Sequence, residues 1–320
     1  MRAWQFEDAE KGLVLNEVPE LEPREGEVVI DVRGAGLCHS DLTYMQHPDM
    51  MAHLPMTEGH EIAGVIAKVG PGVTGWAVGD RVGVCPSGVA APAGVFNDGG
   101  FADQHRCPEA DLARVPDGLS WALAAAATDA GMTSYHAIIK RGRASAGQKV
   151  GVIGYGGLGQ IAARAAMLAG AEVHVAEPKD EVWELARAAG VAGVVADAAD
   201  WAGQSFDLVV DFAGFGTTDA ALAAVKQQFG GRGEPGRVVQ VGLGTGRLDL
   251  AVHYLLGREL IGSLGGTVED IEEVYALMAA GELAPFVTEI GFDEIGEGLQ
   301  RLAAGEVTGR LVAVWGPDAR

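Results

Sequence analysis

The chain has 320 residues, and at roughly 100 to 200 residues per domain this length predicts about two domains. Its 44 acidic and 23 basic residues give a formal charge of −21, which argues against nucleic acid as a partner. No segment approaches the roughly 20 consecutive apolar residues of a membrane-spanning helix, and the first ten residues lack the features of a secretion signal. We therefore expect a soluble, cytoplasmic protein with no membrane partner.

The first 130 residues predict a β-rich domain. Short apolar segments such as 27–32 and 64–69 are separated by Gly, Pro and Asp, which is typical of short strands joined by turns. An alanine-rich stretch at 122–127 predicts helix packing with no site of its own. This half is expected to contain few helices.

Two motifs in this half indicate a catalytic zinc site. Cys38 stands in the sequence Gly-Leu-Cys-His-Ser-Asp, and His60 follows 22 residues later in Gly-His-Glu. Thiolate and imidazole are common zinc ligands, and a catalytic zinc has three protein ligands and one open position. Asp129 is the predicted third ligand, because one thiolate, one carboxylate and one neutral imidazole balance the charge of Zn²⁺. We therefore expect one catalytic Zn²⁺ per chain, and we interpret Cys85 and Cys107 as free thiols.

From residue 149 onward, apolar strands alternate with alanine-rich helices. The expected strands are 150–153, 172–176, 206–211 and 238–241, and the expected helices are 161–168 and 181–189. This alternation predicts βαβ units in a parallel, doubly wound sheet. Two further helices, 268–280 and 299–304, precede a strand at 310–315 that we expect to return to the first domain.

A glycine-rich turn lies between the first strand and the first helix of this alternation. The residues expected to bind a cofactor there are Gly154, Gly156, Gly157, Leu158 and Gly159. Glycines at such a turn let main-chain amides approach a pyrophosphate at the positive end of the helix. The sequence therefore predicts a dinucleotide site.

A single acid suggests which dinucleotide is bound. Glu177 ends the next strand, eighteen residues after Gly159, where a carboxylate can accept hydrogen bonds from both ribose hydroxyls of the adenosine. The same charge repels a 2′-phosphate, so NAD is favoured over NADP. Lys179 keeps NADP open as the alternative, because a lysine there can reach a phosphate. Val241, at the end of strand 238–241, is also expected to contact the cofactor.

In their order and spacing, these motifs resemble the zinc-dependent alcohol dehydrogenases of the medium-chain dehydrogenase/reductase family. The resemblance covers nearly the whole chain and also rests on Gly79-Asp80-Arg81-Val82, Gly99-Gly100-Phe101-Ala102 and Gly309-Arg310. It implies an α/β protein with a GroES-like, β-rich catalytic domain (1–130 and 266–320) and a Rossmann NAD(P)-binding domain (131–265). It also implies a homodimer or homotetramer that associates through the edge of the Rossmann sheet.

The resemblance assigns roles around the metal. It implies that Cys38, His60 and Asp129 hold the zinc and that Glu61 is an alternative or transient ligand. Asp41 resembles the carboxylate that orients the zinc-bound histidine.

It also assigns roles around substrate and cofactor. Ser40 would hydrogen-bond the substrate oxygen and begin proton removal, and Thr133 would contact the nicotinamide. His39 and Arg310 would approach the pyrophosphate.

The chain departs from the common family pattern at two places. Many relatives carry four closely spaced cysteines for a structural zinc, whereas only Cys85 precedes residues 99–101 here, so no structural zinc is expected. Thr43 stands where many relatives have the histidine that ends the proton relay. Because a threonine is no base near neutral pH, we expect the proton to leave through water or another histidine such as His47.

The sequence thus predicts an NAD-dependent zinc alcohol dehydrogenase that interconverts primary or secondary alcohols with aldehydes or ketones. One alternative is a zinc-free, NADPH-dependent quinone or enoyl reductase of the same fold, which would need no ligands at Cys38 and His60. Another is a non-catalytic nucleotide-binding protein, for which intact ligands and the serine at position 40 would be surplus.

Overall fold

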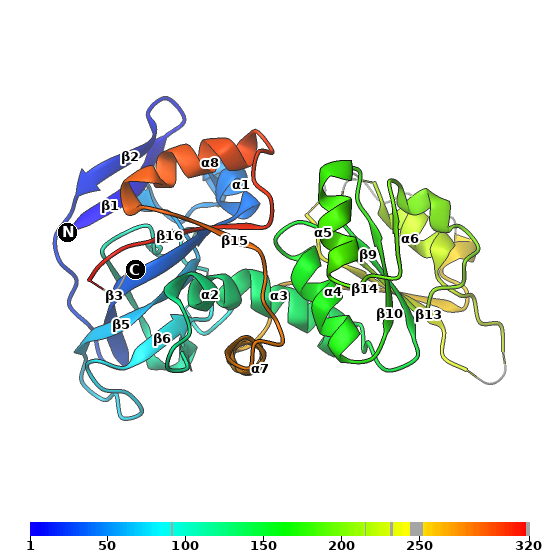
Figure 1. The fold of residues 1–320 in the computed structure, drawn as a ribbon. Coiled ribbons are helices and arrows are strands. Elements are labelled where there is room, and N and C mark those ends of the chain that lie inside the picture. Colours follow the sequence, from blue (N-terminus) through cyan, green and yellow to red (C-terminus); the bar gives the residue numbers. More distant parts are fainter. Residues whose placement is uncertain (91, 215, 231–232, 244–251, 318–320) are drawn as a thin grey trace. The chain divides into compact units, whose positions relative to one another are not determined.

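The structure, a computed structural model, describes residues 1–90, 92–214, 216–230, 233–243 and 252–317 (Figure 1). The chain divides into two compact units. Unit 1 comprises Met1–Met132 and Thr267–Arg320, and unit 2 comprises Thr133–Gly266. The predicted domain ranges placed the two boundaries between residues 130 and 131 and between residues 265 and 266. The last three residues of the predicted range 266–320 lie outside the described residues.

Unit 1 is built mainly of short strands. The strands are β1 (Arg2–Asp8), β2 (Gly12–Glu17), β3 (Glu27–Leu37), β4 (Met56–Thr57), β5 (Glu61–Val69), β6 (Arg81–Val84), β7 (Gln104–Pro108), β8 (Leu112–Arg114), β15 (Val287–Ile290) and β16 (Arg310–Val314). The helical segments are α1 (His39–Gln46), η1 (Pro48–Met50), η2 (Glu109–Asp111), α2 (Trp121–Ala126), η3 (Ala127–Gly131), α7 (Val268–Ala279), η8 (Phe292–Glu294) and α8 (Ile295–Ala303). Helix α3 (Met132–Tyr135) spans the junction between the units.

The C-terminal strand joins the first part of the chain, as expected. β16 pairs antiparallel with β3 and parallel with β15, so the order of the large sheet is β15-β16-β3-β5-β6-β8, and β7 also pairs with β3. A smaller sheet has the order β2-β1-β4. Helix α8 lies over β3 and β16, because Gly298 on α8 comes close to Leu37 and Leu311. The core between these layers is apolar and includes Ile30, Ile62 and other fully buried side chains.

Unit 2 is the predicted doubly wound domain. Its strands are β9 (Lys149–Ile153), β10 (Glu172–Ala176), β11 (Gly193–Val195), β12 (Leu208–Asp211), β13 (Gly236–Gln240) and β14 (Arg258–Gly262). Its helical segments include η4 (His136–Arg141), α4 (Gly159–Leu168), η5 (Asp180–Val182), α5 (Trp183–Ala188), η6 (Ala198–Trp201), α6 (Thr218–Ala224) and η7 (Val252–Tyr254). All strand pairs are parallel, in the order β11-β10-β9-β12-β13-β14. Numbered within the unit, this order is 3-2-1-4-5-6, that of a Rossmann sheet.

The sequence pattern did not predict β11, α6 or β14 of unit 2. β11 has three residues, which is too short for a clear alternation of side chains, and α6 begins only after Thr217 in a glycine-rich segment. β14 is an edge strand with half-buried residues and a charged start at Arg258 and Glu259, so it lacks the apolar run of the central strands.

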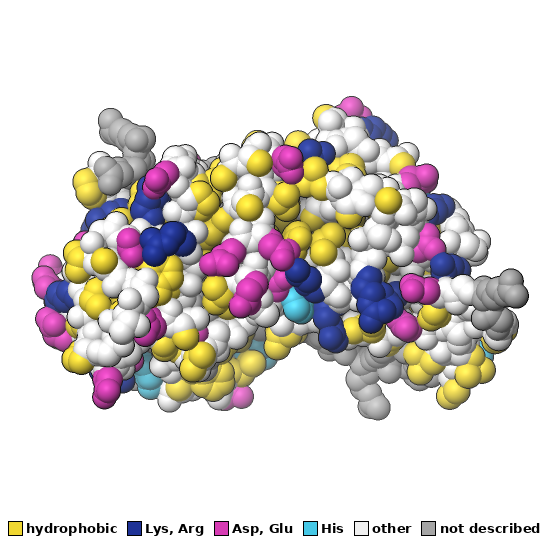
Figure 2. Space-filling model, turned by 90° about the horizontal axis from the view of Figure 1, so that it is seen from below, with side chains coloured by type: hydrophobic (Ala, Val, Ile, Leu, Met, Phe, Trp, Pro, Cys, Tyr) yellow, Lys and Arg dark blue, Asp and Glu magenta, His cyan; other side chains and the backbone are white. Residues whose placement is uncertain are grey.

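The surface carries charges of both signs. In Figure 2, acidic side chains are spread over the face in view, and basic side chains lie next to them. Among the helices of the described residues, none has the length and apolar character needed to cross a membrane.

Candidate metal centre and cofactor turn

Cys38 is placed by the end of a strand and the start of a helix. β3 ends at Leu37, Cys38 is the N-cap of α1, and its main-chain N–H donates to Oδ2 of Asp41 at 2.8 Å. The thiol is buried at the positive end of the helix. That position favours a thiolate.

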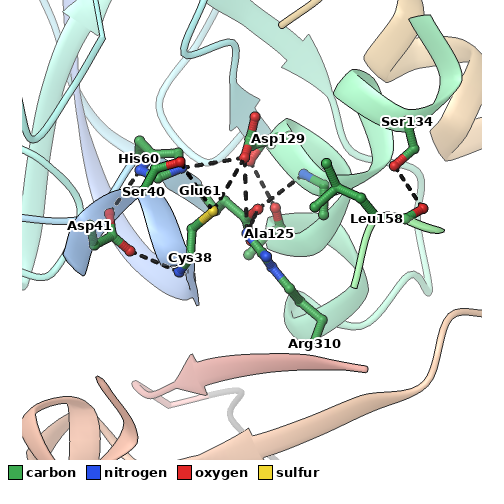
Figure 3. A network of polar contacts seen from close by, with 12 residues as sticks. Cys38, Ser40, Asp41, His60, Glu61, Ala125, Asp129, Ser134, Leu158 and Arg310 are labelled. Carbon is green, nitrogen blue, oxygen red and sulfur yellow. Dashed lines mark hydrogen bonds and ion pairs between the residues drawn. The ribbon is translucent and has the colours of Figure 1, made fainter. Parts of the chain in front are cut away.

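His60 and Asp129 reach the same place from other elements. His60 directly precedes β5, and Asp129 lies in η3, a π-helical turn that continues α2. Nε2 of His60 lies 3.3 Å from Oδ2 of Asp129, and Sγ of Cys38 lies 4.0 Å from the same oxygen (Figure 3). Ligand atoms of all three residues lie within 4.8 Å of one another. They form the one such group of three or more His, Cys, Asp or Glu residues in the described part of the chain.

This donor set fits a zinc ion. Bond lengths of 2.0–2.3 Å at tetrahedral angles separate two zinc ligands by about 3.5 Å. The observed separations of 3.3 and 4.0 Å bracket that value. Oδ1 of Asp41 lies 2.8 Å from Nδ1 of His60, at ion-pair distance although not as a well-directed hydrogen bond. Asp41 thereby engages one ring nitrogen and leaves Nε2 on the side of Asp129.

Neighbouring charges favour the ionised forms of both Cys38 and His60. Burial opposes ionisation of Cys38, but Arg310 and His60 outweigh it and lower the pKa of the thiol. Burial likewise works against a charged His60, but Asp41 and Asp129 raise its pKa well above the usual value. A buried site that stabilises a thiolate beside a carboxylate is suited to a cation.

Glu61 is adjacent to this group but is held by other partners. Its carboxylate forms a buried ion pair with Arg310, in which Nε of Arg310 donates to Oε2 at 3.0 Å and Nη2 donates to Oε1. Oε1 also accepts the main-chain N–H of Ala130 at 3.0 Å. Burial raises the pKa of Glu61 to about 7, although Arg310 opposes that shift. Arg310 also lies 3.9 Å from Oδ2 of Asp129. In this structure it therefore faces the cluster of Cys38, His60 and Asp129, which is called the metal group below.

Sequence reasoning missed this role of Arg310. The arginine and Glu61 are 249 positions apart, and the predicted partner of Arg310 was a pyrophosphate. The one available signal was its place in the closing Gly309-Arg310 motif, which gave no partner.

The remaining predicted residues of unit 1 lie on α1. Ser40 Oγ is 3.6 Å from Sγ of Cys38, which places its hydroxyl beside the metal group. His39 is exposed, and its carbonyl accepts a hydrogen bond from Oγ1 of Thr43 at 3.1 Å. A cavity of about 610 Å³ in the same unit is lined by other residues, among them Gln5 and His105, and by none of the three metal-group residues.

In unit 2, the glycine turn has the expected strand-to-helix setting. Gly154 follows β9 with a φ of +86°, which only glycine adopts without strain, and α4 begins at Gly159. A Cβ on Gly159 would lie 1.8 Å from the carbonyl oxygen of Gly154, whereas a Cβ on Gly156 would meet nothing within 4 Å. The turn therefore packs tightly against the helix and is open at Gly156. The carbonyl of Leu158 accepts a hydrogen bond from Ser134 at 2.9 Å.

Glu177 is tied to this turn. Its carboxylate accepts main-chain N–H groups from Tyr155 at 2.8 Å and from Lys179 at 3.0 Å, and it is 8% exposed. Val241 follows β13 and is half-buried, and its N–H donates to the carbonyl of Asp211. Thr133 is buried at the start of the unit.

Family models of known proteins match segments in both parts of the chain. Residues 24–117 match the family model described as "Alcohol dehydrogenase GroES-like domain", and residues 157–280 match "Zinc-binding dehydrogenase". An alcohol dehydrogenase of Geobacillus stearothermophilus is 32% identical over 98% of this chain and 99% of its own. The chain belongs to the zinc-type alcohol dehydrogenases.

Solved structures of this family superpose over almost the whole chain. Acetophenone reductase from Geotrichum candidum, in complex with NAD, is 30% identical, with a TM-score of 0.87 over 98% of this chain and 97% of that one. A thermostable alcohol dehydrogenase from Pyrobaculum aerophilum with cobalt and zinc bound is 26% identical, with a TM-score of 0.87 over 98% and 99% of the two chains. This dehydrogenase is thus an oxidoreductase for alcohols and carbonyl compounds.

Proposed function

We propose that the protein is an NAD-dependent dehydrogenase in which Cys38, His60 and Asp129 bind one catalytic Zn²⁺. The convergence of these three side chains within 4.8 Å carries the proposal, because they come from three separate segments. The related structures support it, because one is a complex with NAD and another has cobalt and zinc bound. The substrates are primary or secondary alcohols and the matching aldehydes or ketones.

In this proposal the chain's own residues bind the metal and the substrate, orient the metal ligands and begin to remove the proton of the alcohol. When bound, Zn²⁺ supplies a Lewis acid for the substrate oxygen and the nicotinamide supplies the hydride acceptor. Ser40 hydrogen-bonds the substrate oxygen and relays its proton, accepting it while giving up its own to water or to a histidine such as His47, and Asp41 keeps the ring of His60 in place. Glu61 serves as an alternative ligand when its ion pair with Arg310 loosens.

Unit 2 is proposed to hold the dinucleotide. The pyrophosphate is proposed to lie against the amides of the open turn at Gly156. From the family resemblance, His39 and Arg310 are kept as its proposed basic partners, and Arg310 would first have to leave its buried ion pair with Glu61. Glu177 binds the adenosine ribose, Thr133 contacts the nicotinamide and Val241 lies beside the cofactor. The charge of Glu177 favours NAD over NADP.

We also propose that two or four copies associate through the edge of the parallel sheet. β14 is one of the two edge strands, and Val252, Leu255, Leu256 and Leu264 near it in the sequence are exposed. The three cysteines are free and buried, which supports a cytoplasmic location. Light scattering on the purified protein reports the number of copies.

Replacing one ligand tests the catalytic proposal. Wild-type protein should reduce NAD with small primary or secondary alcohols, Cys38→Ser should lose this activity, and Ser40→Ala should lose most of it. Cys85→Ser is the matched control, because it changes another buried thiol outside the metal group. Full activity of Cys38→Ser with NADPH and a quinone or enoyl substrate would instead support the zinc-free reductase.

A further inference from the structure

The π-helical turn that carries Asp129 is anchored by a buried hydroxyl. Oγ1 of Thr128 donates to the carbonyl oxygen of Ala125 at 2.8 Å and accepts the main-chain N–H of Ile62 at 3.2 Å. Thr128 directly precedes Asp129 and is fully buried. Ile62 stands two residues after His60 on β5. One side chain therefore joins the main chain that bears Asp129 to the main chain that bears His60.

The turn needs such an anchor because its hydrogen bonds are irregular. The N–H of Met132 reaches the carbonyl of Ala127, five residues back, where a regular α-helix would reach four residues back. Helical turns of this kind are rare and are frequently found at functional sites. If the turn relaxed to α-helical geometry, each residue after the change would rotate by up to about 100° around the helix axis. The carboxylate of Asp129 would then leave the metal group.

Two further contacts confine Thr128 and its neighbour. A Cβ on Gly83 of β6 would lie 2.8 Å from Cγ2 of Thr128, so the methyl group, together with the hydroxyl of Tyr275, fills the space above that glycine. The carboxylate of Glu61 accepts the N–H of Ala130 on the other side of Asp129. The methyl group of Thr128 thus packs against the sheet, while its hydroxyl fixes the main chain. These two functions can be separated by mutation.

We propose that the hydroxyl of Thr128 is a positioning group for Asp129 and thereby sets the metal affinity of the Cys38, His60 and Asp129 group. The inference rests on the proposed metal site. It assigns Thr128 no contact with the metal, and it predicts that affinity follows the hydroxyl and not the methyl group.

Two variants separate hydroxyl from methyl. Thr128→Val keeps the shape and removes the hydroxyl, whereas Thr128→Ser keeps the hydroxyl and removes the methyl group. Dissociation constants for Zn²⁺ and Co²⁺ are measured on folded, metal-depleted protein by competition with a chelator, and the absorption spectrum of the Co²⁺ form reports the ligand field. Thr128→Val should bind both metals about 10- to 100-fold more weakly, the range found when groups that orient metal ligands are removed. Its Co²⁺ spectrum should shift, and Thr128→Ser should match the wild type within about threefold.

The opposite pattern would overturn the inference. Equal affinity and an unchanged spectrum in Thr128→Val, or a loss confined to Thr128→Ser, would reduce Thr128 to a packing residue. If Thr128→Val does not fold, Thr128→Ala and Thr128→Ser make the same comparison, since both lack the methyl group and only one has the hydroxyl. A wild-type protein that binds neither metal would refute the proposed metal site itself, which distinguishes the two failures.

Discussion

Replacing Glu177 by Ala should shift the cofactor preference from NAD toward NADP. A carboxylate that accepts hydrogen bonds from ribose hydroxyls contributes about 1.5–3 kcal/mol, which corresponds to roughly 10- to 150-fold in kcat/KM with NAD. The buried carboxylate also accepts the N–H of Tyr155, so its loss loosens the glycine turn and weakens both dinucleotides. The ratio of kcat/KM for NADP to that for NAD cancels this common loss.

That ratio should rise by about 10- to 100-fold in Glu177→Ala, because the repulsion of the 2′-phosphate also disappears. Glu177→Gln is the matched variant: it can still accept the N–H of Tyr155 but carries no charge, so its ratio should rise while affinity for NAD falls less. The assay is steady-state oxidation of one alcohol with each dinucleotide. An unchanged ratio in both variants would refute the assignment of Glu177 to the ribose.

Two further predictions concern stability. Gly36→Ala should destabilise the fold by about 3 kcal/mol in urea unfolding, because the new Cβ would lie 1.7 Å from Oε2 of the buried Glu61. Gly262→Ala, with nothing within 4 Å, is the control and should change stability by less than about 0.5 kcal/mol, and equal effects of the two would contradict the packing described. Burial lowers the pKa of His105 to about 4, so the unfolded chain binds this proton more readily and stability falls as the pH drops from about 6.5 to about 4. His105→Gln should remove up to about 3 kcal/mol of that acid-induced loss, and the same substitution at the exposed His53 controls for the loss of one histidine.

The fold follows from local patterns, which explains why most of it was predictable. Apolar strands such as 150–153 and 172–176 are buried in the centre of a parallel sheet, so they appear in the sequence as short apolar runs between helices. The return of strand 310–315 to the first domain was also expected, and β16 pairs with β3. The edge strand β14 was missed because it is only half-buried and starts with charged residues.

Much of the site depends on contacts between distant residues. The motif around Cys38 and the Gly-His-Glu motif indicated metal ligands, because thiolate and imidazole are distinctive zinc donors. The sequence contains no comparable mark of the ion pair between Arg310 and Glu61, which packing alone brings together. The π-helical turn at Asp129 is equally hidden, since its stretch of alanines is typical of an ordinary helix.

The metal content of the purified protein tests the central claim most directly. Protein prepared without chelator should contain about one zinc per chain by elemental mass spectrometry, and Asp129→Ala and Cys38→Ser should contain much less, whereas the control Cys85→Ser should equal the wild type. Two zinc ions per chain would indicate a second set of ligands that this account lacks. A wild-type protein that contains no zinc and takes none up would contradict the proposed metal centre and the dehydrogenase mechanism built on it.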